Sequence, residues 1–144
     1  MIWNILDYFY QSEAWGDPGK MNPMILFLMD KIRGSLPHGC RIKVHCGFAS
    51  DGHSKNSQHY KGNAVDFHVV GLPFLDAETL IITYLHRKRL IDKVGFGIYP
   101  DWNNPGFHLD CRGSRASWGK IETTADYVNY GVALDYAKNK YRGT

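Results

Sequence analysis

The 144-residue sequence has little cysteine and no long hydrophobic run. Its three cysteines show neither the CxxC spacing of a zinc clip nor the density of a disulfide scaffold, so we expect reduced thiols. No apolar run reaches the length of a membrane span, which predicts a protein without membrane insertion. The first residues lack the cationic start and the cleavage site of a signal peptide. We therefore expect synthesis in the cytoplasm and, for a target outside the membrane, release or delivery by another route.

Neither sign of charge dominates, since 17 Lys and Arg against 14 Asp and Glu give a net charge of +3. The basic residues are dispersed apart from HRKR, residues 86–89, which we interpret as the solvent-facing side of a helix. This distribution predicts no nucleic-acid partner. The sequence also has no GxSxG elbow, no P-loop and no GxGxxG after a strand, so it lacks the usual signals of a serine hydrolase or a nucleotide-binding site.

The hydrophobic content of 44% is that of a globular protein, and without repeats or linker-like segments residues 1–144 are predicted to form one domain. A first helix is predicted from Asn22 as the N-cap to Gly34 as the stop, and a second is predicted over residues 77–91 with Asp76 as its cap. Alternating apolar residues predict strands at 41–48, 64–71, 94–100 and 106–113, the last two as a hairpin, before a helix at 123–141. This order predicts an α+β fold with a small, largely antiparallel sheet and flanking helices.

Strand alternation places acids and histidines together. Asp66 and His68 share one face of their predicted strand, and His108 and Asp110 share one face of theirs. Each pair alone would suit a solvated sheet face. Two such pairs, with His59 in the polar segment that precedes the first of these strands, favour a functional site.

The residue types in this site point to zinc. Two imidazoles and one carboxylate suit Zn²⁺ and leave a fourth coordination position open, as in catalytic rather than structural zinc sites. Such a site activates water and polarises a carbonyl, which amide hydrolysis requires, and a nearby carboxylate or histidine could move the proton. A cysteine nucleophile is the weaker alternative, because Cys46 and Cys111 are both expected on buried strand faces as core thiols.

SQHYKGNAVDFHV, residues 57–69, resembles the SxHxxGxAxD signature of the M15 zinc peptidases, the family of D-Ala-D-Ala carboxypeptidases and murein endopeptidases. The five matching residues are Ser57, His59, Gly62, Ala64 and Asp66. Residues 95–118 look like the closing hairpin of this family, and the resemblance covers roughly residues 20–118. The small murein-endopeptidase branch looks most similar. The fold and the first motif are also shared with the signalling domain of hedgehog proteins, which implies a non-catalytic alternative.

The resemblance implies a zinc site made of His59, Asp66 and His108. In a hedgehog-like alignment Asp110 would take the third ligand position instead of His108. If His108 is the ligand, Asp110 would orient a ligand or move the proton. The hedgehog-like alignment also gives Asp101 and His53 as candidates for the proton transfer, against a turn residue and a solvated loop histidine as the plainer interpretations.

One departure from the family concerns substrate binding. Many relatives carry an arginine in the turn after the first strand, where it binds a substrate carboxylate, but here the turn reads GFAS, residues 47–50. This weakens a carboxypeptidase interpretation and favours cleavage within a peptide, although Arg112 or Arg115 could substitute. Trp102 and Trp118 could frame a peptide groove, and His68 is expected to be structural or to line the cleft.

These observations predict a zinc-dependent peptidoglycan peptidase that cleaves an amide bond in the wall peptide. The small size suits a phage or prophage lytic enzyme, and we take the protein to be a monomer. The expected cofactor is Zn²⁺ and the expected partner is a peptidoglycan peptide. The alternative is a non-catalytic, hedgehog-like zinc domain that binds a protein or a cell-wall fragment.

Overall fold

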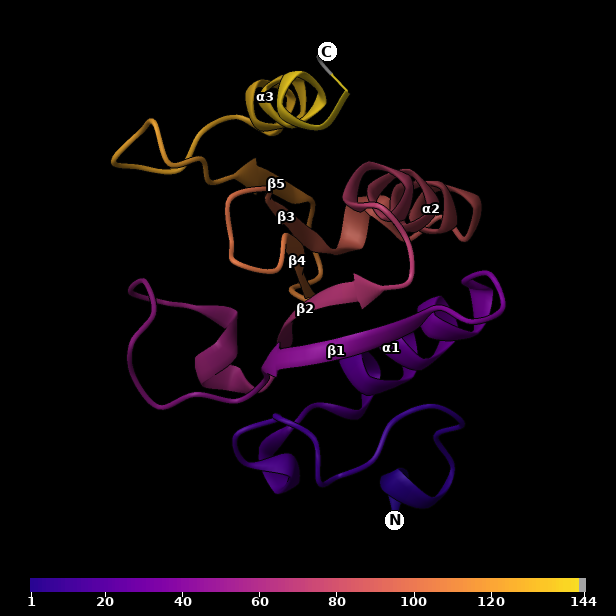
Figure 1. The fold of residues 1–144 in the computed structure, drawn as a ribbon. Helices are drawn as coiled ribbons and strands as arrows, with labels where there is room; N and C mark the ends of the chain where they lie inside the picture. The colour runs from indigo at the N-terminus through magenta and orange to yellow at the C-terminus, as the bar shows by residue number, and fades with distance from the viewer. Residues whose placement is uncertain (143–144) are drawn as a thin grey trace.

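The computed structural model describes residues 1–142, which form an α+β fold of three α-helices and one five-stranded sheet, with short 3-10 turns (Figure 1). The helices are α1 (Pro23–Ser35), α2 (Phe74–Arg87) and α3 (Tyr130–Arg142). The strands are β1 (Arg41–Cys46), β2 (Ala64–Val70), β3 (Gly95–Tyr99), β4 (Gly106–Asp110) and β5 (Ala116–Gly119). The predicted α+β class is confirmed.

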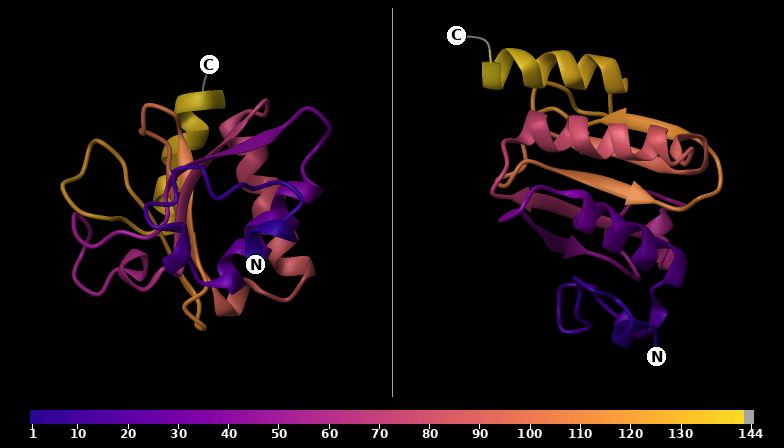
Figure 2. Two further views of the ribbon diagram at one scale, coloured as in Figure 1. Left: turned by 90° about the horizontal axis from the view of Figure 1, so that it is seen from below. Right: turned by 90° about the vertical axis from the view of Figure 1, so that its right-hand side faces the viewer.

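The sheet has the strand order β1-β2-β4-β3-β5. Its neighbouring strands are antiparallel except for β3 and β5, which are parallel, and β3 and β4 form the predicted hairpin. Strand β5 was not predicted from the sequence. Helices α1 and α2 cover one face of the sheet, whereas the loops after β1 and after β5 lie on the other (Figure 2). The helix-free face is therefore available for a site.

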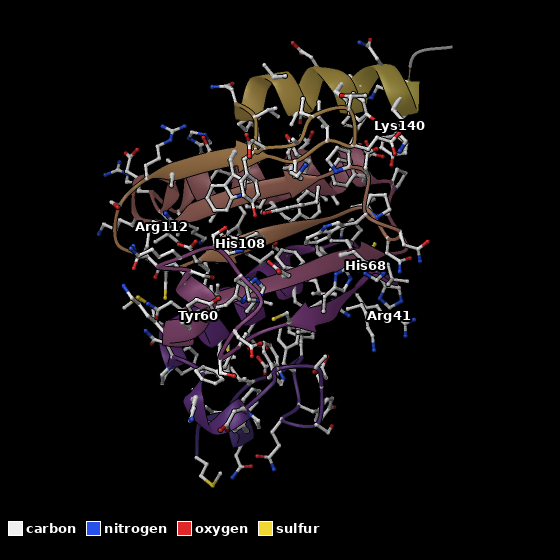
Figure 3. The ribbon with its side chains drawn as sticks, turned by 90° about the vertical axis from the view of Figure 1, so that its left-hand side faces the viewer. Arg41, Tyr60, His68, His108, Arg112 and Lys140 are labelled. Carbon is white, nitrogen blue, oxygen red and sulfur yellow. The ribbon has the colours of Figure 1, made fainter. Side chains whose placement is uncertain are left out.

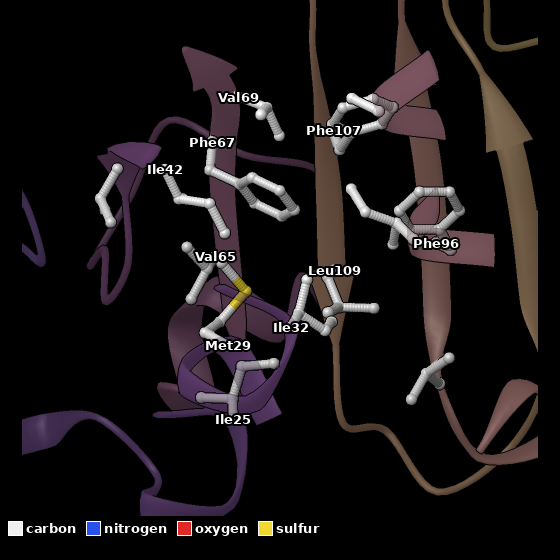
Figure 4. Packing of buried hydrophobic residues seen from close by; sticks show 14 of the residues in the cluster. Ile25, Met29, Ile32, Ile42, Val65, Phe67, Val69, Phe96, Phe107 and Leu109 are labelled. Carbon is white, nitrogen blue, oxygen red and sulfur yellow. The ribbon is translucent and has the colours of Figure 1, made fainter. Parts of the chain in front are cut away.

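The core lies between the sheet and the helices. Val44, Phe67, Phe107 and Ile98 are paired across four strands and are almost fully buried. They belong to one apolar cluster with Ile25, Met29 and Ile32 of α1 (Figure 4). Ile81 and Leu85 of α2 belong to the same cluster. Each such buried side chain stabilises the fold by about 1.5–3 kcal/mol. This face fixes the register of the strands, and thereby the positions of the polar residues on the opposite face.

The boundaries of all three helices differ from the predictions. Asn22 is the N-cap of α1 as predicted, with Oδ1 accepting from the Met24 amide at 2.9 Å, but the helix passes Gly34 and ends at Ser35. Helix α2 begins at Phe74, so Asp76 lies in its first turn and is not its cap, and the helix ends at Arg87. Residues 123–129 precede α3, because Val128 pairs with Gly119 in an isolated bridge. Within residues 1–142, no helix is both long enough and apolar enough to cross a membrane.

Candidate metal centre

One row of residues crosses the whole sheet on its helix-free face. Cys46 pairs with Asp66, Asp66 with His108, His108 with Gly97, and Gly97 with Trp118. Because residues directly opposite one another on neighbouring strands lie on the same face, the register brings these five positions together. The row supplies a carboxylate and an imidazole at the centre of the sheet.

His59 joins this row from the short turn Gln58–Lys61, which precedes β2. Ser57 begins the turn, with Oγ accepting from the His59 amide at 3.2 Å, and Gly62 ends it in the left-handed conformation. A Cβ atom at Gly62 would lie 1.9 Å from the carbonyl oxygen of Lys20, so only glycine fits there. The serine, histidine and glycine of the SxHxxG pattern thus shape the turn that buries His59 against β2.

The three predicted ligands meet in the structure. The Asp66 carboxylate lies 3.2 Å from Nε2 of His59 through Oδ2 and 2.9 Å from Nδ1 of His108 through Oδ1. One donor atom from each residue lies within 4.8 Å of the others, and the two imidazole rings meet edge to face. His59 and His108 are buried, whereas Asp66 is partly exposed.

The outer nitrogen of each imidazole also has a partner. Nδ1 of His59 lies 2.7 Å from the carbonyl oxygen of Gly47, and Nε2 of His108 lies 2.7 Å from Oδ2 of Asp110. Both partners accept a hydrogen bond from the outer nitrogen, so the inner Nε2 and Nδ1 atoms can offer lone pairs to a cation. Histidine ligands of zinc are typically oriented by a carbonyl or a carboxylate in this way. The donor set and its surroundings therefore fit a zinc ion with three protein ligands.

Asp110 lies behind His108 and outside the donor cluster. Its side chain is fully buried, and its oxygens accept hydrogen bonds from the amide of Gly95 and from Nε and Nη2 of Arg112. A Cβ atom on Gly95 would lie 2.5 Å from Asp110 Oδ2, so glycine makes room for the carboxylate. Of the two alternatives in the HLD segment, His108 is the residue that lies with His59 and Asp66.

The pKa values reflect this packing of opposite charges. Burial alone would raise the pKa of Asp66, but hydrogen bonds from His108 and His59 hold it well below its usual range. Burial alone would lower the pKa of His59, yet contacts with Asp66 and Cys46 raise it to about 10. Burial alone would also lower the pKa of His108, but hydrogen bonds with Asp110 and Asp66 raise it. The neighbouring carboxylates thus favour protonation of both imidazoles, and a divalent cation would compete with these protons.

The cluster lies at a cavity of about 660 Å³ with aromatic walls. The ring of Tyr99 stacks on that of Trp102 with 4.2 Å between centroids, and its hydroxyl accepts from Nε1 of Trp118 at 2.8 Å. Trp102 and Trp118 thus line the cavity, as expected, and His108 and Arg112 can be followed on this face in Figure 3. The lining also includes residues that were not singled out from the sequence, among them Tyr99, Lys120 and Tyr127.

His53 also reaches the site. Its ring stacks on that of His59 with 4.2 Å between centroids and lines the cavity. Its backbone is fixed by Tyr60, whose hydroxyl accepts from the His53 amide and donates to the His53 carbonyl. Burial lowers the pKa of His53.

Asp101 does not line the cavity. Its carboxylate accepts from the hydroxyl of Tyr136 and the amine of Lys140, both on α3, and from the amide of Glu122. These bonds tie the loop after β3 to the last helix. Arg115 likewise lies away from the cavity, where it pairs with Asp92 at 3.5 Å.

The prediction of a core thiol is wrong for Cys46. The pairing register shifts between Val44 and Cys46, and this irregularity moves Cys46 from the core face to the face of Asp66. Its Sγ lies 3.7 Å from ring nitrogens of both His53 and His59. His45, in the irregular stretch, contacts His68, and its ring lies tilted beside that of Trp102 with 5.4 Å between centroids. Cys111 is partly buried and packs against the core, close to the prediction.

Sequence comparison finds similarity to the probable peptidoglycan L,D-endopeptidase MepK of Haemophilus influenzae, with 27% identity over 110 residues. The match covers 68% of this chain and 55% of that protein, so the chain spans about half the length of this relative. No family model and no solved structure matches the chain. The chain is thus distantly similar to a protein named as a peptidoglycan endopeptidase, and it carries a candidate His/Asp metal site.

Proposed function

We propose that this chain is a zinc-dependent peptidase that hydrolyses an amide bond in the peptide part of peptidoglycan. The observation that carries the proposal is the convergence of His59, Asp66 and His108 at an aromatic-walled cavity. The distant similarity to a protein named as a peptidoglycan endopeptidase supports the choice of substrate. A wall substrate means that the protein acts outside the cytoplasmic membrane.

Nε2 of His59, the carboxylate of Asp66 and Nδ1 of His108 would hold the zinc ion. When bound, zinc supplies a water molecule of lowered pKa and polarises the scissile carbonyl. The chain keeps both imidazoles in the required tautomer, because Gly47 and Asp110 accept hydrogen bonds from their outer nitrogens. Asp110 in turn is held in place by two hydrogen bonds from the Arg112 side chain.

His53 is our candidate for moving the proton. It lines the cavity, whereas Asp101 is bound to α3 and Asp110 lies behind His108. Burial lowers the pKa of His53, so its imidazole is neutral near neutral pH and can accept a proton. It would then deliver this proton to the nitrogen of the leaving amine.

The cavity favours cleavage inside a peptide over removal of a terminal residue. A carboxypeptidase needs a cation that is free to bind the substrate carboxylate. Arg112 lines the cavity, but Nε and Nη2 of its guanidinium are engaged by Asp110, and the amine of Lys120 donates to the carbonyl oxygen of Thr124. The remaining lining cation, Lys55, lies in the exposed loop before His59. Tyr99, Trp102 and Trp118 instead form an apolar wall against which a peptide chain can lie.

Digestion of purified peptidoglycan tests the proposal. Zinc-loaded protein is expected to release new amino groups, and the release should stop with a chelator and return with added zinc. His59→Ala is expected to lower the rate more than about 100-fold, because a ligand of the required ion is lost. His86→Ala, on the exposed side of α2, is the matched control and should behave as the native protein.

Two results would contradict the peptidase. Zinc binding near one ion per chain without any release of amino groups would support a non-catalytic binding domain. Release that persists in a chelator would exclude the metal-dependent mechanism.

A further inference from the structure

Cys46 lies at one end of the row across the sheet, but the proposed peptidase gives its thiol no role. Its Sγ is 3.7 Å from Nε2 of His53 and 3.7 Å from Nδ1 of His59. One donor atom from each of these three residues lies within 4.8 Å of the others. The side chain of Cys46 is only partly buried, so a small ion can reach it.

We propose that Cys46, His53 and His59 form a second cation site, which prefers thiophilic divalent ions such as Cd²⁺ and shares His59 with the zinc ligands. At the bond lengths of zinc, a sulfur and a nitrogen ligand of a tetrahedral site lie about 3.6 Å apart, close to both observed separations. A thiolate with two imidazoles is a softer donor set than two imidazoles with a carboxylate. The two sets therefore differ in the ions that they select.

His59 couples the two sites through its two ring nitrogens. Its Nε2 lies 3.2 Å from Asp66, and its Nδ1 faces Cys46 and the carbonyl oxygen of Gly47. A cation bound by Nδ1 displaces the proton that is shared with Gly47, and so removes the hydrogen bond that orients His59 for zinc. Occupation of the second site is thus expected to weaken zinc binding at the first.

The local backbone supports such a site. The register shift before Cys46 fixes its thiol on the cavity side of the sheet. His53 lies in the loop between β1 and the turn of His59, and its backbone is held by Tyr60 while its ring stacks on His59. Nε2 of His53 is the ring nitrogen that faces the Cys46 thiol.

Titration of the metal-free protein with Cd²⁺ tests the thiol directly, since thiolate-to-cadmium charge transfer gives an ultraviolet absorption band. The native protein is expected to show this band and Cys46→Ser to lack it. Cys111→Ser, in which another partly buried cysteine is replaced, should retain it. Zinc binding by Cys46→Ser with native affinity would show that this variant is folded. A band that persists in Cys46→Ser, or that is missing from the native protein, overturns the proposal.

A second pair of variants tests the shared ligand. His59→Ala is expected to weaken Cd²⁺ binding by at least about 10-fold, whereas His108→Ala should keep the band, because His108 belongs to the zinc set alone. Unchanged Cd²⁺ affinity in His59→Ala would contradict the sharing. These measurements use no wall substrate, so their outcome is independent of whether the chain is a peptidase.

Discussion

Asp110 holds the imidazole of His108 from behind, with Oδ2 2.7 Å from Nε2, and leaves Nδ1 facing Asp66. The two residues are two positions apart on β4, so both project to the helix-free face. The same carboxylate receives Nε and Nη2 of Arg112. Through this chain of contacts a buried charge pair determines which nitrogen of His108 is offered to a cation.

Asp110→Asn tests the orienting role. The amide cannot accept as a carboxylate does from both His108 and Arg112, so the ring loses its fixed tautomer. We expect zinc affinity to fall about 10–100-fold, measured by competition with a chelator. Asp92→Asn is the control, because Asp92 is an exposed partner of Arg115. Equal affinity in Asp110→Asn and the native protein would show that Asp110 does not orient a ligand.

Gly97→Ala tests the aromatic wall. Gly97 lies beside Trp118 in the row, and a Cβ atom there would lie 2.6 Å from Nε1 of the indole. The indole must move, which breaks its hydrogen bond to Tyr99. We expect KM for a wall peptide to rise about 10-fold or more while zinc content stays at the native level. Ser117→Ala, on the opposite face of β5, should change neither quantity, and a native KM in Gly97→Ala would argue against the wall.

Asp101→Asn separates a structural from a catalytic role. Loss of the bonds to Tyr136 and Lys140 should loosen α3 and lower Tm by on the order of 5 °C. The rate of wall-peptide hydrolysis, measured well below the new Tm, is expected to stay within about threefold of native. A general base would instead contribute about 100-fold or more to this rate. A large loss of rate with an unchanged Tm would restore Asp101 as the base.

Glu78→Gln tests a buried carboxyl far from the site. Glu78 lies on α2 with 6% of its surface exposed, and its Oε2 has no hydrogen-bond partner among the described residues. Burial raises its pKa, against the opposing charges of Lys138 and Arg142. The folded state binds this proton more tightly than the unfolded state does. The contribution of the protonated carboxyl to the free energy of unfolding is therefore fully present below the unfolded pKa of about 4.3, and it is lost as the pH rises through the folded pKa.

The variant cannot ionise, so it is expected to melt at a higher temperature than the native protein near pH 7. Near pH 4 the two proteins should melt at nearly the same temperature. Glu122→Gln, at an exposed position, controls for the loss of one surface charge. A Glu78→Gln variant that is less stable than native near pH 7 would contradict the raised pKa.

Much of the site could be predicted because period-two alternation is a local property of a strand. It placed His108 and Asp110 on one face, and Asp66 on one face with His68, before any pairing was known. The pairing of Asp66 with His108 then follows from the buried face, where Phe67 opposes Phe107. The turn around His59 carries its own local signals in Ser57 and Gly62.

The rest depends on contacts that alternation does not encode. The register shift after Val44 reverses the side to which Cys46 projects, and nothing in RIKVHC marks it. The structural role of Asp101 could not be predicted from its local sequence, because its partners Tyr136 and Lys140 lie 35 and 39 positions later, on α3. The glycines of β3 were a missed signal. Gly95 and Gly97 lie on the same face of this strand, where Gly95 leaves space for Asp110 and Gly97 leaves space for Trp118.

The central claim is that His59, Asp66 and His108 together bind the zinc ion on which hydrolysis of the wall peptide depends. X-ray absorption at the zinc edge of the protein loaded with one zinc ion per chain tests the claim most directly. We predict a shell of nitrogen and oxygen atoms at about 2.0–2.1 Å with the scattering of two imidazoles, and the loss of one imidazole in His108→Ala. A sulfur atom at about 2.3 Å, or a spectrum that His108→Ala leaves unchanged, would contradict the account.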